Sequence, residues 1–594
     1  MAMNGALNDA QTAAVASASP RTLVLAGAGT GKTMTLAYRV AALLADGWPP
    51  SSILALTFTR RAAAQMAERV ASLAGPAALE EMWLGTIHAI CYRVLCEHGH
   101  RIGYPEAPSV YGEEDAKAVL ESVLTGLDLR CSLRQAGEAM RHGTADRDLR
   151  RAVAEYRRQL KVACAVDYDG LLTAALELLD IPEVRDGYRA RFPHVLVDEV
   201  QDLFPASWSL LDKLAPEHLY LVGDDAQSIY GWLGASMDRL LALPGVGYAV
   251  HTLTRCYRCT RPVLALGNAI LRQNARRLKK TLVTDKDGEP VCAKGFPDDE
   301  AEAAWVAAEA GRLYDGGTPW GAMAVLCRTN ALAERLAGAL GAAEVPVQQV
   351  GGLDPFATPA GRLVADVLRA AVHPHDEMAL RRVLLAAGAT PEALARLELD
   401  RHRRQVSLRE AANGLPGASA TRLVLALAEL AASLAADGAQ AARAVLAGLR
   451  RIPPLAHLGG GVFAAPILRA LGTWRRAGGR TAGDLLVFLA TKAAIDLWEP
   501  AEDAVTVATI HGVKGLEWPV VFVPGWEQGM LPHRAGMGSP EAVEEERRVA
   551  HVAVTRAADR LHVTFAAERR EFSRVFRRVR SPLLDSLFEG VGAP

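Results

Sequence analysis

The residues with the most specific chemistry form a glycine-rich segment near the N-terminus, Ala26-Gly27-Ala28-Gly29-Thr30-Gly31-Lys32-Thr33. An apolar stretch that favours a strand precedes it and a helical pattern follows it, which is the setting of a phosphate-binding loop. Glycines let backbone N–H groups converge on phosphate oxygens, and the helix N-terminus adds positive potential. We expect Lys32 to reach the β- and γ-phosphates of a nucleotide and the Thr33 hydroxyl to bind Mg²⁺. The alternative, a glycine-rich turn with an incidental lysine, does not explain the flanking strand and helix.

A second candidate lies where the apolar stretch Val195-Leu196-Val197 ends in two acids, Asp198 and Glu199. The C-terminal edge of a strand can present both carboxylates to a phosphate-binding loop beside it. Asp198 would then hold Mg²⁺, directly or through water, and Glu199 would orient and deprotonate an attacking water. The alternative is a solvated acidic turn, and the presence of a phosphate-binding loop in the same chain disfavours that interpretation.

A third segment combines acids, an amide and aromatic rings: Leu221-Val222-Gly223-Asp224-Asp225-Ala226-Gln227-Ser228-Ile229-Tyr230-Gly231-Trp232. Gln227 can sense a γ-phosphate by donating a hydrogen bond. Trp232 is a candidate platform for a nucleobase, because ring stacking tolerates any base and contributes ~1–3 kcal/mol. Tryptophan is more often a core residue, and the segment alone favours that interpretation.

These segments need strands and helices to position them. Short β-branched runs alternate with longer helical patterns, a rhythm typical of parallel sheets covered by helices. The strand signal disappears at about 113–180 and 374–500. We therefore expect an α/β protein with two parallel-sheet domains, each interrupted by a helical insertion. Helices are expected at 33–45, 60–73 and 207–214, and strands at 22–26, 53–57, 195–198, 219–223, 249–253, 323–326, 505–509, 520–523 and 561–565.

Composition narrows the class of protein. The 594 residues are 50% hydrophobic and 22% charged, which is ordinary globular usage and excludes a disordered or fibrous chain. With 66 Lys+Arg and 67 Asp+Glu the net charge is −1, so a nucleic-acid partner would have to be held by a local track. Eight cysteines do not make a disulfide scaffold, and we see neither a signal peptide nor an apolar run of ~20 residues. We expect a cytoplasmic protein that does not associate with membranes.

The three segments resemble motifs I, II and III of the UvrD/Rep-like superfamily 1 DNA helicases. Further segments resemble the remaining motifs in the family's order: Leu7–Gln11 (Q motif), Leu56–Ala63 (Ia), Gly85–His88 (Ib), Cys256–Arg258 (IV), Thr509–Glu517 (V), and Glu544–Arg548 with Val554–Ala557 (VI). Nine motif-like segments in order are far more specific than any one of them.

The resemblance implies ATP and Mg²⁺ as cofactors and assigns roles by motif. In the ATP site, Gln11 would read the adenine edge, Tyr257 would stack on adenine and Glu517 would meet the ribose side. Two arginines, Arg258 and Arg556, would reach the γ-phosphate. The implied DNA-binding residues are Phe58, Arg60, His88, Trp232 and His511.

The implied fold has two RecA-like motor domains with helical insertions. Domain 1A would span 1–97 and 181–253, 1B 98–180, 2A 254–373 and 501–594, and a shortened 2B 374–500. The implied activity is ATP-driven movement on single-stranded DNA, 3′→5′, with unwinding of tailed duplexes by a monomer or weak dimer. The alternative is a nucleotide-gated module that binds single-stranded DNA and recruits partners without unwinding.

Several positions depart from the family pattern without removing a metal or phosphate ligand. We expect them to affect the coupling between ATP and DNA more than catalysis. They are Met34 for an arginine, Val200 for an aromatic residue, Ala226 for an aspartate, Leu233 for an arginine and Cys256 for an asparagine.

Three weaker signals have open interpretations. Cys256 and Cys259 have C-x-x-C spacing, but no second pair nearby completes a zinc site. The segment 569–580 alternates arginines with apolar residues at helical spacing, which favours a docked surface helix over a nucleic-acid contact. Basic residues could line a phosphate track or a solvated helix face: Arg272, Arg276, Arg277, Lys279 and Lys280.

Overall fold

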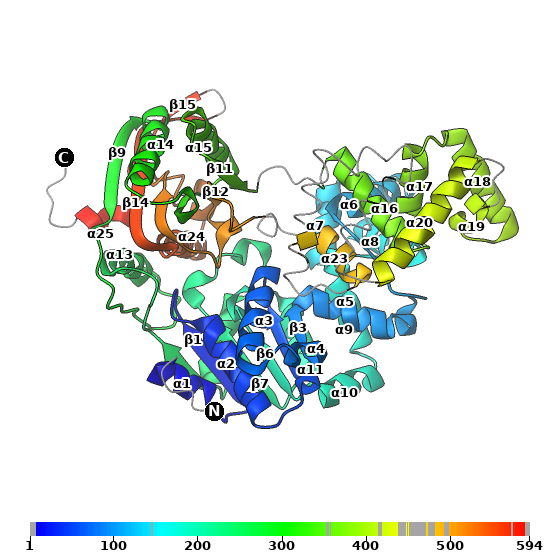
Figure 1. Cartoon of the computed structure of the whole chain (residues 1–594), viewed down its shortest axis with the longest axis horizontal. Helices are drawn as coiled ribbons and strands as arrows, with labels where there is room; N and C mark the ends of the chain where they lie inside the picture. Colours follow the sequence, from blue (N-terminus) through cyan, green and yellow to red (C-terminus); the bar gives the residue numbers. More distant parts are fainter. Residues whose placement is uncertain are drawn as a thin grey trace.

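Two sheets and a group of helices organise the chain in the computed structural model (Figure 1). Among the residues that it describes, none of the helices combines the length and apolar composition needed to cross a membrane. The structure describes residues 7–588 apart from 143, 145, 352–355, 357, 414–417, 437–446, 448–449, 451–470, 473, 475–480, 492–497 and 572–573.

The first sheet is parallel throughout and has the strand order β3-β2-β6-β7-β1-β8. Buried apolar side chains on both faces explain its continuous hydrophobic runs, as expected for a sheet covered by helices. Its strands are β1 (Arg21–Ala26), β2 (Ile53–Thr57), β3 (Trp83–Thr86), β6 (His194–Val197), β7 (His218–Gly223) and β8 (Ala249–Leu253). Its helices are α1 (Asp9–Val15), α2 (Lys32–Ala45), α3 (Arg60–Ala74), α4 (Ala78–Glu81), α5 (Ile87–His98), α9 (Tyr168–Leu178), α10 (Pro182–Arg191), α11 (Pro205–Leu214) and α12 (Met237–Ala242).

The second sheet has the order β11-β12-β10-β13-β14-β15, with β9 also paired to β14. All its pairs are parallel except β14 with β15. Its strands are β9 (Cys292–Asp298), β10 (Met323–Cys327), β11 (Val347–Val350), β12 (Val505–Thr509), β13 (Trp518–Val523), β14 (Ala557–Glu571) and β15 (Arg574–Arg577). Its helices are α13 (Arg261–Arg272), α14 (Asp299–Asp315), α15 (Asn330–Ala342), α24 (Pro540–Val554) and α25 (Asp585–Phe588).

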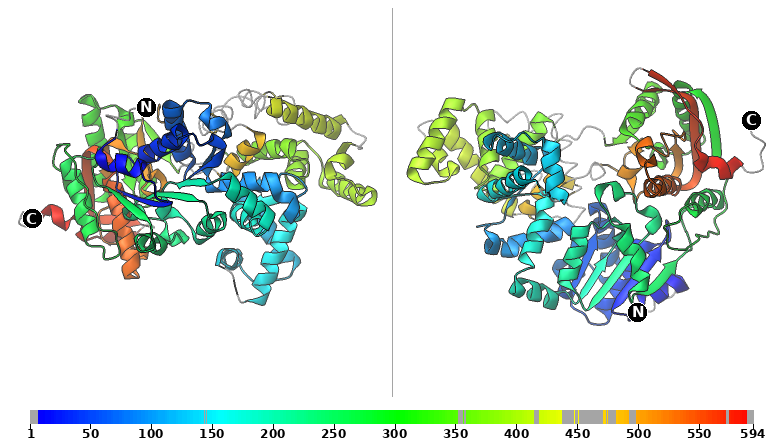
Figure 2. Two further views of the ribbon diagram at one scale, coloured as in Figure 1. Left: turned by 90° about the horizontal axis from the view of Figure 1, so that it is seen from below. Right: turned by 180° about the vertical axis from the view of Figure 1, so that it is seen from behind.

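The two insertions lie side by side, on the right of Figure 1, and they are also adjacent in both views of Figure 2. Buried Arg369 of the second insertion pairs with Asp115 of the first. The first holds α6 (Glu113–Gly126), α7 (Leu133–His142) and α8 (Arg147–Val162), and the second holds α17 (Glu377–Ala386), α18 (Pro391–Arg404), α19 (Leu408–Asn413), α20 (Ala418–Ala436) and α23 (Ala482–Thr491). α16 (Pro359–Val372) shares the buried cluster of these last helices, so the second insertion begins before the expected boundary at 374.

Two expectations about the insertions and the C-terminal segment are wrong. The first insertion is not purely helical, because β4 (Ser109–Tyr111) and β5 (Ala165–Asp167) form a small parallel sheet. The basic segment 569–580 is not a helix. It contains the end of β14 and the antiparallel strand β15, with residues 572–573 outside the described part. Arg569 is 2% exposed and pairs with Glu302 and Glu527, so it belongs to the core rather than to a basic face.

Candidate active site

The glycine-rich segment leaves β1 at Ala26 and enters α2 at Lys32, as a phosphate-binding loop should. Gly29 and Gly31 have φ values of 69° and 81°, a left-handed region that favours glycine. A Cβ on Gly29 would lie 2.7 Å from the Cβ of Arg258 and 2.9 Å from the sulfur of Cys256. The loop therefore faces residues of the chain's second half.

Buried acids surround the N-terminus of α2. The hydroxyl of Thr33 donates to Asp198 Oδ2 at 3.2 Å. The ammonium of Lys32 lies 3.8 Å from Glu199 and 3.9 Å from Asp224. These distances bring the residues expected to bind phosphate and Mg²⁺ to one place, at the C-terminal edge of the first sheet.

The charges of these groups depend strongly on one another. Burial, with Glu199 beside it, raises the pKa of Asp198 to about 7. Burial also acts to raise the pKa of Glu199, but Lys32 and Lys514 outweigh it and the net shift is downward. Lys32 opposes the rise at Asp198 without cancelling it, and a divalent cation bound to the carboxylate oxygens of Asp198 would add positive charge there.

Two arginines of the second half complete the site. The guanidinium of Arg556 is 1% exposed and donates to the carbonyl of Leu516 at 3.0 Å and to Gln227 Oε1 at 3.3 Å. Arg258 pairs with Glu517 and donates to the carbonyl of Thr555 at 3.0 Å. Burial and the neighbouring Arg258 lower the pKa of Arg556 to about 9. Among the described residues no carboxylate forms an ion pair with Arg556, and its guanidinium donates to neutral oxygens of Val552, Leu516, Gln227 and Thr555.

Two lysines that the sequence did not single out as site residues also join the halves. Lys280, which follows α13, pairs with Asp224 at 2.9 Å and with Asp225, and its side chain is 6% exposed. Lys514 pairs with buried Asp202 and donates to the carbonyl of Gln227 at 2.7 Å. Both expectations for Lys280, a phosphate track or a solvated helix face, are therefore wrong. Lys514 stands inside the motif V segment, which was the signal that could have found it.

The expected adenine-binding residues meet beside the loop. Tyr257 is 52% exposed and its hydroxyl accepts from the side-chain amide of Asn8 at 2.7 Å. Gln11 is buried, and its amide donates to the carbonyl of Thr30 at 3.0 Å while its oxygen accepts from the N–H of Asn8. In this arrangement Gln11 braces the phosphate-binding loop, and the exposed ring of Tyr257 is the surface available for a base.

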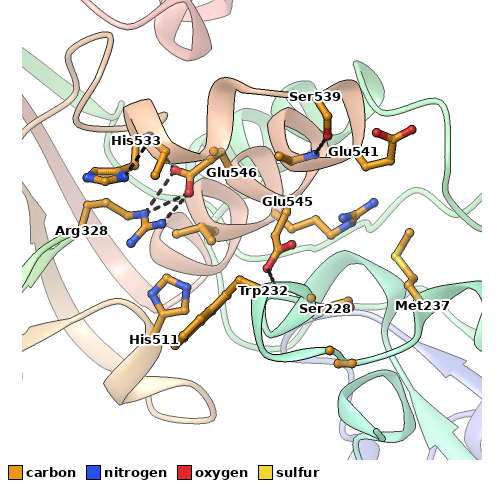
Figure 3. Close-up of a pocket in the computed structure, with 18 of the residues that line it drawn as sticks. Ser228, Trp232, Met237, Arg328, His511, His533, Ser539, Glu541, Glu545 and Glu546 are labelled. Carbon is orange, nitrogen blue, oxygen red and sulfur yellow. Dashed lines mark hydrogen bonds and ion pairs between the residues drawn. The ribbon is translucent and has the colours of Figure 1, made fainter. Parts of the chain in front are cut away.

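A separate cleft of about 1000 Å³ lies between the two halves on the side of Trp232 (Figure 3). Trp232 is 67% exposed, so the core interpretation of this residue is wrong. Its ring meets His511 edge-on, with centroids 6.4 Å apart. Burial lowers the pKa of His511 to about 4, so the ring is neutral at ordinary pH. The guanidinium of Arg328, which also lines the cleft, donates to Glu546 Oε1 at 2.6 Å.

The other expected DNA-binding residues divide into two groups. Phe58 stacks on Tyr230, with centroids 5.3 Å apart, and so adjoins the segment that carries Trp232. Arg60 instead donates to the carbonyls of Val487 and Phe488 in α23, at 3.1 and 3.2 Å. His88 stacks on Tyr168 at 3.8 Å. The structure therefore brings Trp232, His511 and Phe58 together and places Arg60 and His88 beyond the cleft.

Several departures from the family pattern can be located. Val200 is buried against Gly223, where a Cβ would lie 2.5 Å from its side chain. Ala226 is buried, Leu233 is 47% exposed beside Trp232, and Met34 lies near Gly31. Cys256 and Cys259 are both buried, and no cluster of three or more His, Cys, Asp or Glu side chains suited to a metal occurs in the described part of the chain.

Comparison with known proteins agrees with this geometry. The UvrD/REP helicase N-terminal domain matches residues 7–140 and 128–245, and the UvrD-like helicase C-terminal domain matches 251–413 and 484–568. The chain is 33% identical to ATP-dependent DNA helicase UvrD1 of Mycobacterium tuberculosis, over 98% of this chain and 86% of that protein. It is 31% identical to DNA helicase II of Escherichia coli, over 96% and 85% of the two chains. The chain therefore belongs to the UvrD/Rep-like superfamily 1 helicase family.

Proposed function

We propose that the protein is an ATP-dependent DNA helicase that moves 3′→5′ on single-stranded DNA and unwinds tailed duplexes. The observation that carries the proposal is the meeting of two chain halves at one buried site. Lys32, Asp198 and Glu199 come from the first half, and the cations Arg258 and Arg556 come from the second. Relatives named as ATP-dependent DNA helicases support the same activity.

Each residue of the site has a distinct task in this proposal. The N–H groups of the glycine-rich loop and Lys32 bind the phosphates of ATP, while Thr33 and Asp198 supply hard oxygen ligands for Mg²⁺. Mg²⁺ held by these oxygens would supply positive charge to the phosphates. Glu199, whose pKa is lowered, stays ionised and accepts a proton from the attacking water. The arginines stabilise charge on the transferring phosphoryl group.

Two short segments can transmit the state of the ATP site to the DNA cleft. The segment 227–232 begins with Gln227, which contacts Arg556, and ends with Trp232 in the cleft. The segment 511–514 begins with His511 beside Trp232 and ends with Lys514, which contacts the carbonyl of Gln227. The hydroxyl of Tyr230 also donates to the carbonyl of His511 at 3.1 Å. A change in the separation of the halves would therefore alter both sites together.

The test is strand displacement on duplexes that carry either a 3′ or a 5′ single-stranded tail, with ATP and Mg²⁺. We expect unwinding of the 3′-tailed duplex only, and loss of unwinding but retention of ATP binding in Glu199→Gln. Unwinding restricted to the 5′-tailed duplex would contradict the proposed direction. Nucleotide-dependent binding of single strands with no displacement of either duplex would instead identify the protein as a binding module.

A further inference from the structure

Two cysteines lie in close contact immediately before α13, at the border of the ATP site. Cys256 and Cys259 are 2% and 0% exposed. The backbone N–H of Cys259 donates to the sulfur of Cys256 at 3.4 Å. In C-x-x-C turns such contacts stabilise the thiolate of the first cysteine. The pair thus has the arrangement of a nucleophilic and a resolving thiol.

The chemistry of Cys256 differs from that of the other cysteines. The hydrogen bond from Cys259, with backbone N–H groups and Arg258, lowers the pKa of Cys256 to about 6 against the effect of burial. Burial raises the pKa of Cys91 to about 12, and it also raises the pKa values of Cys164, Cys292 and Cys327. At neutral pH Cys256 therefore carries the largest thiolate fraction among these cysteines.

The pair is also tied to groups that bind the nucleotide in the proposed function. A Cβ on Gly29 would approach the sulfur of Cys256 to 2.9 Å, and the N–H of Tyr257 donates to the carbonyl of Gly29 at 2.9 Å. Arg258 stands between the two cysteines. Its guanidinium and the Cys259 thiol donate to the same carbonyl, that of Thr555, at 3.0 and 3.7 Å.

We propose that Cys256 and Cys259 form a thiol–disulfide modification site whose oxidation by a hydroperoxide turns off the ATPase. The effect on the ATPase rests on the proposed function, whereas the modification itself does not. Because the sulfur of Cys256 lies against the phosphate-binding loop, the hydroperoxide can reach it only when the halves separate. The disulfide would pull Cys259 from the carbonyl of Thr555 and restrain the backbone that carries Arg258.

The oxidation is balanced in two steps. The Cys256 thiolate attacks the O–O bond of the hydroperoxide, an S–O bond forms, and the alkoxide leaves and takes up a proton. The Cys259 thiol then attacks the same sulfur. The S–S bond forms, the S–O bond breaks, and the hydroxide leaves as water with the Cys259 proton. Two thiols lose two electrons and two protons, and the hydroperoxide is reduced to an alcohol and water.

The experiment treats the reduced full-length protein with tert-butyl hydroperoxide and follows two signals, peptide mapping of cysteine linkages and DNA-stimulated ATPase. We expect a Cys256–Cys259 linkage, a fall in ATPase of at least about tenfold, and recovery of both signals after dithiothreitol. A non-hydrolysable ATP analogue with Mg²⁺ should slow the linkage, because it holds the halves together.

Control variants separate the possible causes, each compared with its own reduced activity. Cys256→Ser, which removes the attacking thiolate, should keep its ATPase under hydroperoxide treatment, whereas Cys96→Ser, which alters an exposed cysteine, should remain sensitive and should recover with dithiothreitol. Absence of the linkage in the oxidised protein, or a linkage with unchanged ATPase, would overturn the inference. Absence of ATPase in the reduced protein would contradict the proposed function instead, since the linkage could still be mapped.

Discussion

The two halves of the molecule face each other with opposite charges. The first half contributes buried or nearly buried acids to the boundary, namely Asp198, Glu199, Asp202, Asp224 and Asp225. The second half contributes cations, namely Arg258, Lys280, Lys514 and Arg556. Lys32 of the first half and Glu517 of the second have the other sign, and each lies beside charges opposite to its own; Glu545 of the second half also meets the first, at the N–H of Trp232.

This difference explains why the proposed reaction needs both sheets. In that proposal the first half holds the nucleotide and its metal, but its own acids leave little positive charge for the γ-phosphate. The second half supplies that charge only when it lies against the first. Burial makes each cross-boundary pair sensitive to separation, because an unpaired buried charge is costly. The charges thus couple hydrolysis to the relative position of the halves.

The largest effect is expected from Lys32→Ala, which removes the cation that the first half places beside Glu199 and Asp224. The variant leaves these acids to the second half's Lys514 and Lys280 and removes positive charge from the β- and γ-phosphates. We expect ATP turnover to disappear in steady-state assays with single-stranded DNA. Retention of more than a small fraction of the activity would contradict the assignment of the phosphate-binding loop.

Removing either arginine tests the contribution of the second half. Arg258→Ala and Arg556→Ala should each lower hydrolysis by ~10³–10⁵ and abolish unwinding, because a guanidinium stabilises the transferring phosphoryl group. Single-strand binding without nucleotide should remain nearly unchanged. Lysine at either position should rescue poorly, since it lacks the planar fork of donors. Near-normal hydrolysis in both alanine variants would mean that the nucleotide does not lie between the halves.

Much of the scaffold could be predicted because parallel strands rich in β-branched and apolar residues leave a strong local signal. The runs 53–57, 249–253 and 505–509 have the same bounds in the sequence prediction and in β2, β8 and β12. The sequence did not predict short or unusual elements. The small sheet of β4 and β5 has strands of three residues, and the end of β14 shows arginines at helical spacing although it pairs as a hairpin.

The site residues also divide into those with a local sequence signal and those without one. Motifs located the acids and arginines, since each lies at the end of a recognisable strand or helix. They could not show that Lys280 neutralises Asp224 and Asp225, because the partners are brought together only by docking of the halves. They also could not show that Arg60 contacts α23, which follows it by more than 400 residues. Contacts of this kind depend on tertiary structure that no local pattern records.

A smaller effect is expected from Lys280→Met, which keeps the length of the side chain but leaves two buried acids unpaired. Removing one partner of a buried ion pair costs about 3–5 kcal/mol. Because Lys280 and its acids lie on opposite halves, we expect this cost to weaken the contact between the halves. Asp224 should then attract Lys32 more strongly, so KM for ATP should rise more than kcat falls. Lys279→Met is the matched control, because Lys279 is exposed. Identical kinetics for the two variants would show that Lys280 does not link the halves.

The smallest effect is expected in the cleft, where Trp232 extends from the first half toward His511 of the second. The ring is 67% exposed, so Trp232→Ala creates no cavity and should leave the melting temperature unchanged. Loss of one stacked base should weaken single-strand binding by ~1–3 kcal/mol, from about fivefold to about 150-fold in Kd. ATP affinity without DNA should stay the same, because Trp232 does not reach the nucleotide site.

Trp232→Phe should restore part of the binding, since phenylalanine keeps a ring face for the base. Fluorescence anisotropy with a labelled oligonucleotide measures the affinities, and thermal unfolding provides the control. Unchanged DNA affinity in the alanine variant would remove Trp232 from the DNA site and leave His511 and Phe58 as its remaining candidates near the cleft.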